Sequence, residues 1–191
     1  MPVADDVLHR LAASLREAER TGVPRGPLSS DHPDLSIPDA YRIQRVTIDQ
    51  KVSDGEQITG KKIGLTSQAM QDLLGVGQPD YGHLLTSMEV EGNRTDVASL
   101  VQPRVEAEIA FVLARDLPMS GVTSAQVIDA TGHVVAALEI VDSRVADWKI
   151  TIVDTVADNA SSGRYVLGDR RVDPRSIELP AVAMRFTRNG A

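Results

Sequence analysis

In the first third of the chain, hydrophobic positions recur with the period of an α-helix. Between about Ala4 and Arg20 an apolar residue returns every three or four positions, which is typical of an amphipathic helix. The stripe consists of Val7, Leu8, Leu11, Leu15 and Ala18. A second helix is predicted from near Ser36 to Gly55, with Pro38 in its first turn, where proline is well tolerated.

Two shorter helices are predicted from their capping residues. Ser67 precedes a brief apolar segment that Gly75 closes, because a serine hydroxyl can accept from the first-turn N–H groups and glycine permits the left-handed conformation of a helix end. Thr123 and Gln126 form a T-x-x-Q capping box, which predicts a helix that Gly132 closes.

From Val101 the pattern changes to the period of two that is typical of strands. In the segment R-V-E-A-E-I-A-F-V-L, Glu106 and Glu108 project from the same face. The opposite face is apolar and carries Ile109, Phe111 and Leu113. Since the remaining positions on the glutamate face are also apolar, the strand is predicted to be buried on both sides.

Other strands are predicted at T-G-K-K-I-G-L, at R-Y-V-L-G and at A-V-A-M-R-F-T-R, with a short helix between Asp154 and Ala160. Asn189-Gly190 after the last of these is a strong hairpin signal, but the chain stops one residue later. An unpaired final strand leaves an exposed edge that proteins usually avoid. We therefore expect the chain to be part of a longer polypeptide or a form without its C-terminal strands.

Composition narrows the possible classes of protein. The chain has 191 residues, which suits one sizeable core, and only 3% aromatic residues, so that core must be aliphatic. A net charge of −7 argues against a nucleic-acid partner, and the lack of cysteine excludes disulfides and cysteine nucleophiles. With no apolar run of membrane-spanning length and no secretory signal, a cytoplasmic protein without a membrane partner is expected.

The candidate chemistry lies in acidic residues within apolar strands. Glu106 and Glu108 share a strand face, and Glu139 repeats the pattern in H-V-V-A-A-L-E-I-V-D. Burying like charges together costs several kcal/mol unless a cation or hydrogen bonds compensate. Three such carboxylates indicate a hard divalent cation with oxygen ligands. The alternative is that E-x-E lies on the solvated face of an edge strand.

Five motifs in order resemble one family. They are G-K-K-I-G-L-T-S, G-V-G-Q-P-D-Y-G, Q-P-R-V-E-A-E-I-A-F-V, A-L-E-I-V-D-S-R and D-N-A-S-S-G. Together they resemble the 2-keto-4-pentenoate hydratase and 4-oxalocrotonate decarboxylase family, within the fumarylacetoacetate hydrolase superfamily. The resemblance runs from the first helix to Ala191, and family members continue for some further strands.

The resemblance implies an α+β fold, a mixed β-roll with N-terminal helices, here without its C-terminal strands. Residues 1–60 would form the helical region and residues 61–191 the metal-binding β-roll. The implied cofactor is Mg²⁺ or Mn²⁺, and the implied assembly is a homo-oligomer, with a pathway enzyme as a further expected partner. The implied site comprises metal ligands Glu106, Glu108 and Glu139, the acid/base pair Lys62 and Asp80, and the substrate contacts Leu73, Asn159 and Ser161.

The implied reaction adds water to 2-hydroxypenta-2,4-dienoate and gives 4-hydroxy-2-oxopentanoate, a step of aromatic catabolism. The alternative is decarboxylation of 2-oxo-3-hexenedioate. Asp80 favours the hydratase, because decarboxylase members tend to carry an apolar residue there and a carboxylate would repel a second substrate carboxylate. Two further hypotheses are a Schiff-base lyase with Lys62 as nucleophile and a non-catalytic subunit of a related enzyme.

Taken alone, several of these residues have simpler interpretations. One of Lys61 and Lys62 should face solvent, because they alternate in a strand. Asp80 after Pro79 is a natural turn former. The N-A-S-S segment that begins at Asn159 is equally typical of a loop that satisfies backbone groups at a helix end. Arg144 and Lys149 are expected to form ordinary ion pairs.

Overall fold

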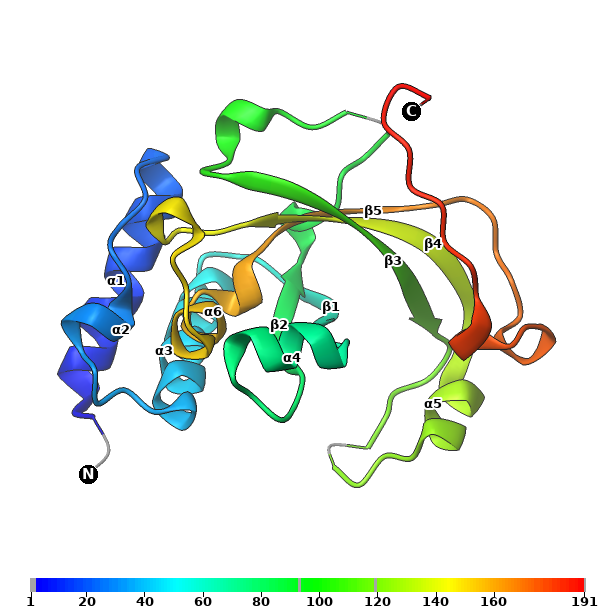
Figure 1. The fold of residues 1–191 in the computed structure, drawn as a ribbon, viewed down its shortest axis with the longest axis horizontal. Helices are drawn as coiled ribbons and strands as arrows, with labels where there is room; N and C mark the ends of the chain where they lie inside the picture. The colour runs from blue at the N-terminus through cyan, green and yellow to red at the C-terminus, as the bar shows by residue number, and fades with distance from the viewer. Residues whose placement is uncertain (1–2, 93, 119, 191) are drawn as a thin grey trace. The chain divides into compact units, whose positions relative to one another are not determined.

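The computed structural model describes residues 3–92, 94–118 and 120–190 (Figure 1). The helices are α1 Asp5–Thr21, α2 Leu28–Asp31, α3 Ile37–Ser53, α4 Gln68–Leu74, α5 Ser124–Ala130 and α6 Ile152–Ala157, joined by short 3₁₀ turns. The strands are β1 Ile58–Gly64, β2 Asp80–Leu85, β3 Pro103–Leu113, β4 Thr131–Asp142 and β5 Ser162–Leu167. β1 and β2 form an antiparallel pair, and the other strands form a sheet in the order β3-β4-β5. The fold is therefore α+β, as expected.

The chain divides into two compact units. The first unit comprises Met1–Arg104 and Ile140–Arg164, and the second comprises Val105–Glu139 and Tyr165–Ala191. Strands β3, β4 and β5 each contribute residues to both units. The division that the family resemblance implied, into a helical region of residues 1–60 and a β-roll of residues 61–191, stays a prediction.

The hydrophobic core of the first unit is built by the amphipathic helix expected at the N-terminus. The buried face of α1 is the predicted stripe without Val7 and with Ala12 added, and α1 packs against α3. The same core cluster contains Ile43 from α3, Val156 from α6 and Val145 from the segment after β4. Gly22 follows α1 with φ of 69°, so it supplies the left-handed conformation that ends the helix.

The capping predictions are confirmed by hydrogen bonds. The Ser36 side chain accepts from the Asp39 backbone N–H and opens α3, and the Ser67 side chain accepts from the Met70 backbone N–H and opens α4. The capping box that begins at Thr123 opens α5. One boundary was wrong, because α5 ends at Ala130 and Gly132 lies inside β4. The pairing of β4 with its neighbours begins earlier than the glycine signal suggested.

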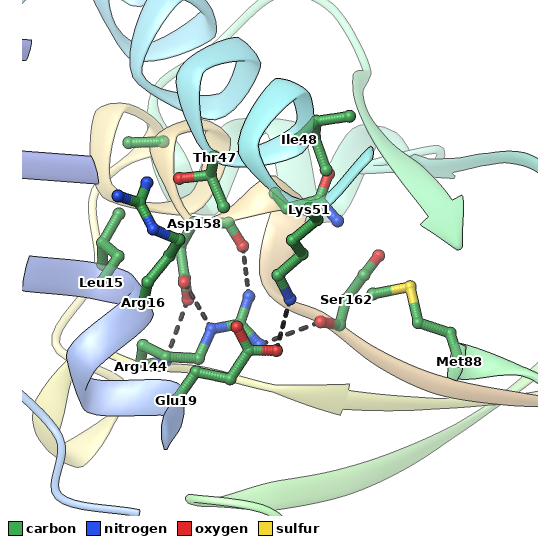
Figure 2. A pocket seen from close by; sticks show the side chains of 12 residues that line it. Leu15, Arg16, Glu19, Thr47, Ile48, Lys51, Met88, Arg144, Asp158 and Ser162 are labelled. Atoms are coloured by element: carbon green, nitrogen blue, oxygen red, sulfur yellow. Dashed lines mark hydrogen bonds and ion pairs between the residues drawn. The ribbon is translucent and has the colours of Figure 1, made fainter. Parts of the chain in front are cut away.

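A buried arginine joins three segments of the first unit. Arg144 is 6% exposed, and its Nε donates to Asp158 Oδ1 at 2.6 Å while its backbone N–H donates to Asp158 Oδ2 at 2.9 Å. Nη2 donates to the Asp158 carbonyl at 2.6 Å, and Nη1 donates to the carbonyls of Asp142 and Ser162. Figure 2 shows the contacts of Arg144 with Asp158 and Ser162, and the Lys51–Glu19 ion pair, which spans 2.7 Å, lies beside them. Arg144 thus ties the end of β4 to the end of α6 and the start of β5.

The opposite charges in this pair act against a strong desolvation effect. Complete burial raises the pKa of Asp158 to about 6, and the Arg144 guanidinium opposes that rise. The same carboxylate helps to hold the pKa of Arg144 above its ordinary value. Arg144 therefore remains charged, and it pairs in the ordinary structural way that the sequence predicted. Lys149 likewise pairs with Asp147, at 3.1 Å and in solvent.

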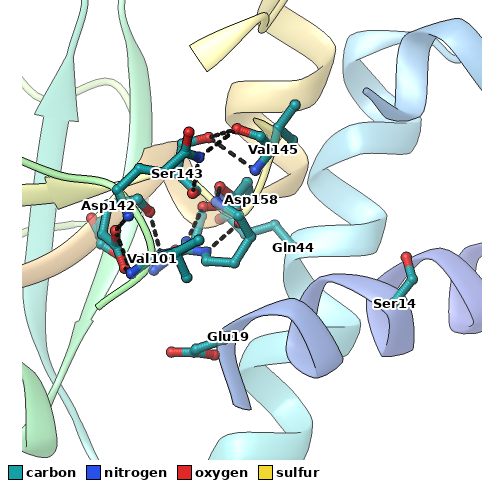
Figure 3. Close-up of polar contacts among 12 residues, drawn as sticks. Ser14, Glu19, Gln44, Val101, Asp142, Ser143, Val145 and Asp158 are labelled. Carbon is teal, nitrogen blue, oxygen red and sulfur yellow. Dashed lines mark hydrogen bonds and ion pairs between the residues drawn. The ribbon is translucent and has the colours of Figure 1, made fainter. Parts of the chain in front are cut away.

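A second buried carboxylate organises the entry to β3. Asp142 is 2% exposed and accepts hydrogen bonds from the backbone N–H groups of Val101 and Gln102, as Figure 3 shows for Val101. The Gln102 side chain in turn donates to the carbonyls of Ser143 and Val145. Polar groups at the end of β4 thereby hold the segment that leads into β3.

Two strand predictions were wrong. β3 is an edge strand, and Val105, Phe111 and Leu113 on its outer face are 47%, 40% and 44% exposed, so the strand is not buried on both sides. Residues 182–187 form no strand, and Met184 is 56% exposed. A strand needs a partner for its N–H and C=O groups, and the described residues supply none here.

The turn predicted at Asn189 and Gly190 has the expected backbone conformation, although the residues before it form no strand. Asn189 and Gly190 have φ of 53° and 83°, which is the conformation that the hairpin signal predicted. The helix predicted between Asp154 and Ala160 ends earlier, at Ala157, because the chain turns left-handed from Asn159 onward. Among the described residues, no helix is both long and apolar enough to cross a membrane.

We predict that Arg144→Ala lowers the free energy of unfolding by about 3–5 kcal/mol, because it leaves the Asp158 carboxylate buried without its cation. Lys149→Ala is the matched control, since its ion pair is exposed and its loss should change stability by less than about 0.5 kcal/mol. Urea unfolding of both variants measures the difference. Equal, small effects for the two substitutions would contradict the structural role assigned to Arg144.

Candidate functional site

Three carboxylates meet in the second unit. Glu106 and Glu108 lie on β3 and Glu139 on β4, and one oxygen from each can be chosen so that all lie within 4.8 Å of one another. Glu106 is exposed, Glu108 is half-buried and Glu139 is 6% exposed. The period of two places the first pair on one face, and the pairing of β3 with β4 brings the third residue beside them.

This group has the donor chemistry and the spacing for a hard divalent cation. Mg²⁺ prefers carboxylate oxygens at roughly 2.1 Å in octahedral geometry, so adjacent ligands lie about 3.0 Å apart and opposite ligands about 4.2 Å apart. The glutamate oxygens lie within 4.8 Å of one another, and they would move inward to hold such an ion. Three protein ligands would also leave coordination positions for water or substrate oxygens.

Lys62 and Asp80 lie together in the first unit. The β1–β2 register pairs Lys62 with Gly82 and Gly64 with Asp80, which puts both side chains near the end of the strand pair. Lys62 Nζ donates to the Ala160 carbonyl at 3.0 Å. A side chain at Gly64 would meet Asp80 Oδ1 and also contact Lys62 Nζ, so these two groups converge beside Gly64.

Asp80 is the buried titratable group of this cluster. It is 3% exposed, and neither carboxylate oxygen has a hydrogen-bond partner among the described residues. Burial raises the pKa of Asp80, and the Lys62 ammonium opposes the rise. A carboxyl group held in this way changes its protonation nearer neutral pH than an exposed aspartate does.

A left-handed turn completes the cluster. Asn159, Ala160 and Ser161 have φ of 54°, 51° and 53°, a conformation that residues other than glycine rarely adopt. Ser161 is 3% exposed, and its hydroxyl has no partner among the described residues. The Asn159 side chain is bonded to the backbone of His83, at 2.7 Å to its N–H and 2.9 Å to its carbonyl. The turn therefore supplies a carbonyl to Lys62 and an unpaired buried hydroxyl.

The expected alternation of the two lysines is confirmed. Lys61 is exposed and Lys62 is half-buried. Lys61 Nζ lies 2.9 Å from His83 Nε2 and 4.6 Å from the centre of the Tyr81 ring. Partial burial lowers the pKa of Lys61, and burial together with the nearby Lys61 charge lowers the pKa of His83. Lys61 therefore belongs to a separate surface cluster.

Most of the residues named from the sequence gather in these two groups. The described residues place the three glutamates together in the second unit and Lys62, Asp80, Asn159 and Ser161 together in the first. Leu73 lies in α4, but its side chain is outside what the structure describes.

Gln44 was missed by the sequence interpretation. It is 1% exposed in α3, and its Nε2 donates to the carbonyls of Tyr81 and Val156. Its Oε1 lies 3.1 Å from His83 Nδ1. A single glutamine in an amphipathic helix carries no signal for this position, because its partners are distant backbone groups.

Comparison with known proteins identifies relatives of this chain. No family profile matches it. It is 49% identical to a 2-keto-4-pentenoate hydratase of Paraburkholderia phymatum over 97% of this chain and 71% of that protein. It is 48% identical to a 2-hydroxyhexa-2,4-dienoate hydratase of Comamonas testosteroni over 92% of this chain and 68% of that protein.

A solved structure shares the fold. The 4-oxalocrotonate decarboxylase of Pseudomonas putida G7, complexed with magnesium and adipate, superimposes with a TM-score of 0.88 and 33% identity over 93% of this chain and 68% of that chain. The same enzyme complexed with calcium and acetate gives a TM-score of 0.86. Fold and relatives together define an enzyme of the lyase class. The chain belongs to the 2-keto-4-pentenoate hydratase family.

We predict that Asp80→Asn stabilises the folded protein at neutral pH. The raised pKa means that the folded state binds the Asp80 proton more tightly than the unfolded state, so the charged carboxylate costs stability above the folded pKa. The gain should be complete above the folded pKa of Asp80 and vanish as the pH falls towards about 4, near the ordinary aspartate value. Urea unfolding across this range measures it.

Asp34→Asn, at an exposed aspartate, is the control and should change stability little at any of these pH values. A loss of stability in Asp80→Asn at about pH 8 would show that the buried carboxylate is compensated, and would contradict the prediction.

Proposed function

We propose that this chain is a divalent-metal-dependent hydratase that adds water to 2-hydroxypenta-2,4-dienoate and gives 4-hydroxy-2-oxopentanoate. The observation that carries the proposal is the identity of the relatives. Curated hydratases of 2-keto-4-pentenoate and related dienoates are 45–49% identical to the chain. The solved decarboxylase structures are only 32–33% identical.

In this proposal Glu106, Glu108 and Glu139 hold Mg²⁺ or Mn²⁺. Their convergence within 4.8 Å and their all-oxygen chemistry support the assignment. The bound cation would act as a Lewis acid towards the carboxylate and C2 oxygen of the substrate. Glu139 is buried and Glu106 is exposed, so solvent reaches the group at Glu106.

Lys62 and Asp80 are assigned the proton transfers. The substrate must lose the proton of its C2 hydroxyl and gain one at C5, and water must then add at C4 with a proton at C3. Asp80 suits this work because its raised pKa lets it hold or release a proton near working pH. Lys62 is kept in place by the Ala160 carbonyl and provides the positive charge next to Asp80.

The remaining assignments concern the substrate. The Ser161 hydroxyl is buried and unpaired among the described residues, so it is available to donate a hydrogen bond to a substrate oxygen. Asn159 belongs to the same turn, and Leu73 is proposed as an apolar neighbour of the substrate. Homo-oligomeric assembly, a pathway-enzyme partner, a cytoplasmic location and a β-roll closed by further strands stay predictions.

Decarboxylation is the second candidate, because the fold closely matches a 4-oxalocrotonate decarboxylase. Asp80 argues against it. The ionised form of this buried carboxylate would repel the second carboxylate of a six-carbon diacid.

Product analysis tests the choice between the two reactions. The chain is mixed with 2-hydroxypenta-2,4-dienoate or with 2-oxo-3-hexenedioate, each with Mg²⁺, and both water addition and CO₂ release are measured. We expect 4-hydroxy-2-oxopentanoate from the first substrate and little CO₂ from the second. Faster CO₂ release than water addition would establish the decarboxylase instead, and neither product would exclude both reactions for this chain.

Metal binding is tested separately from turnover. Glu106→Gln and Glu139→Gln are each expected to weaken Mg²⁺ binding at least 10–100-fold in titration calorimetry, since each removes a charged oxygen ligand. Both variants should keep the helical circular dichroism of the unaltered protein. Glu178→Gln, an exposed glutamate of the same unit, is the control and should bind Mg²⁺ normally. A variant with unchanged affinity would remove its glutamate from the ligand set.

A further inference from the structure

We propose that Asn159 is a positioning residue, whose side-chain amide holds the left-handed turn Asn159–Ser161 against β2 and thereby places the Lys62 and Ser161 groups for reaction. The proposal rests on the function proposed above for Lys62 and Ser161. It changes the expected role of Asn159, which the family resemblance puts in contact with the substrate.

The amide of Asn159 is engaged with one residue of the strand. Its Oδ1 accepts from the His83 backbone N–H at 2.7 Å, and its Nδ2 donates to the His83 carbonyl at 2.9 Å. An asparagine side chain has one carbonyl oxygen and two N–H donors, so this pair of bonds uses its oxygen and one donor. Asn159 is also 6% exposed. Little of the amide remains for a substrate.

The turn that these bonds hold is strained. Asparagine tolerates positive φ, but Ala160 and Ser161 have φ of 51° and 53°, a conformation that alanine and serine rarely adopt. Such a conformation persists only where the surroundings impose it. The bonds from Asn159 to β2 are the side-chain contacts that hold the first residue of this turn.

The groups of the proposed chemistry depend on this conformation. The Ala160 carbonyl accepts from Lys62 Nζ at 3.0 Å, so a shift of the turn moves the partner of Lys62. The Ser161 hydroxyl has no hydrogen-bond partner among the described residues, so the backbone turn alone must direct it. Both effects act through the backbone and not through contact between Asn159 and a substrate.

The sequence of β2 allows the turn Asn159–Ser161 to lie close to the strand. A side chain at Gly82 would overlap the carbonyl oxygen of Asn159, so only glycine lets the turn come this close to the strand. Gln44 strengthens the same junction from α3, by donating to the carbonyls of Tyr81 in β2 and Val156 in α6. These contacts thus hold β2, the end of α6 and the turn together.

The test compares Asn159→Gly with Gly82→Ala. Glycine keeps the permitted positive φ at position 159 but lacks the amide, whereas an alanine at position 82 forces the turn away from β2 and leaves the amide in place. Each is expected to lower kcat for hydration about 10–100-fold, because small misplacements of reacting groups are costly, while KM changes less than about 3-fold.

Gly60→Ala is the matched control, since a methyl group there meets only Leu84 at an ordinary distance of 3.6 Å. It should leave kcat and KM near the values of the unaltered chain. A rise in KM for Asn159→Gly with kcat preserved would show direct substrate contact and overturn the proposal. Unchanged kcat in either Asn159→Gly or Gly82→Ala would also overturn it.

A second measurement separates this proposal from the proposed function. Hydrogen exchange at the His83 amide should become faster in Asn159→Gly than in the unaltered chain, because the acceptor of its N–H is lost. If the unaltered chain shows no hydration, the hydratase proposal fails by itself, and exchange at His83 still decides whether Asn159 holds the strand. Unaltered exchange would mean that the amide does not hold it.

Discussion

The buried pair of Arg144 and Asp158 is the interaction on which the first unit depends. Removing an arginine from water is costly, and the cost is offset only when its N–H groups find good acceptors. Here the guanidinium reaches the Asp158 carboxylate and three backbone carbonyls. Those partners lie at the end of β4, at the end of α6 and at the start of β5, so the pair is satisfied only when β4, α6 and β5 have all taken their places.

The same pair explains why the strained turn can exist. Asp158 directly precedes Asn159, so the Arg144 contacts secure the turn from the helix side. The bonds from Asn159 to His83 secure it from the strand side. Between these two attachments, Ala160 and Ser161 adopt the left-handed conformation that neither residue prefers. The stability of the ion-pair region thus supports a local conformation that is unfavourable by itself.

The proposed site contains buried polar groups that are left unsatisfied. Asp80 and Ser161 both carry buried polar atoms that lack hydrogen-bond partners among the described residues, and the carboxylate cluster places like charges close together. Arg16 and Thr47, outside the proposed site, also carry such atoms. By contrast, Arg144 and Asp142 have their polar groups well satisfied. Proteins retain unsatisfied or strained groups mainly where binding or catalysis uses them, and the unsatisfied groups of Asp80 and Ser161 agree with the proposed site.

The sequence by itself determined the features that depend on neighbouring residues. The stripe of α1, the caps at Ser67 and Thr123 and the turn at Asn189 follow from local spacing and backbone preference, and all were predicted. The E-x-E pair also needed only the period of a strand, and the motif order was enough for the family.

Tertiary structure decided what depends on distant partners. Burial of β3 and formation of a strand at residues 182–187 were predicted wrongly, because hydrogen-bond partners and covering side chains come from elsewhere in a fold. The same reason hid the role of Gln44 and the attachment of Asn159 to His83. The family resemblance therefore named the candidate site residues, and only the packing of remote backbone groups showed which contacts hold them in position.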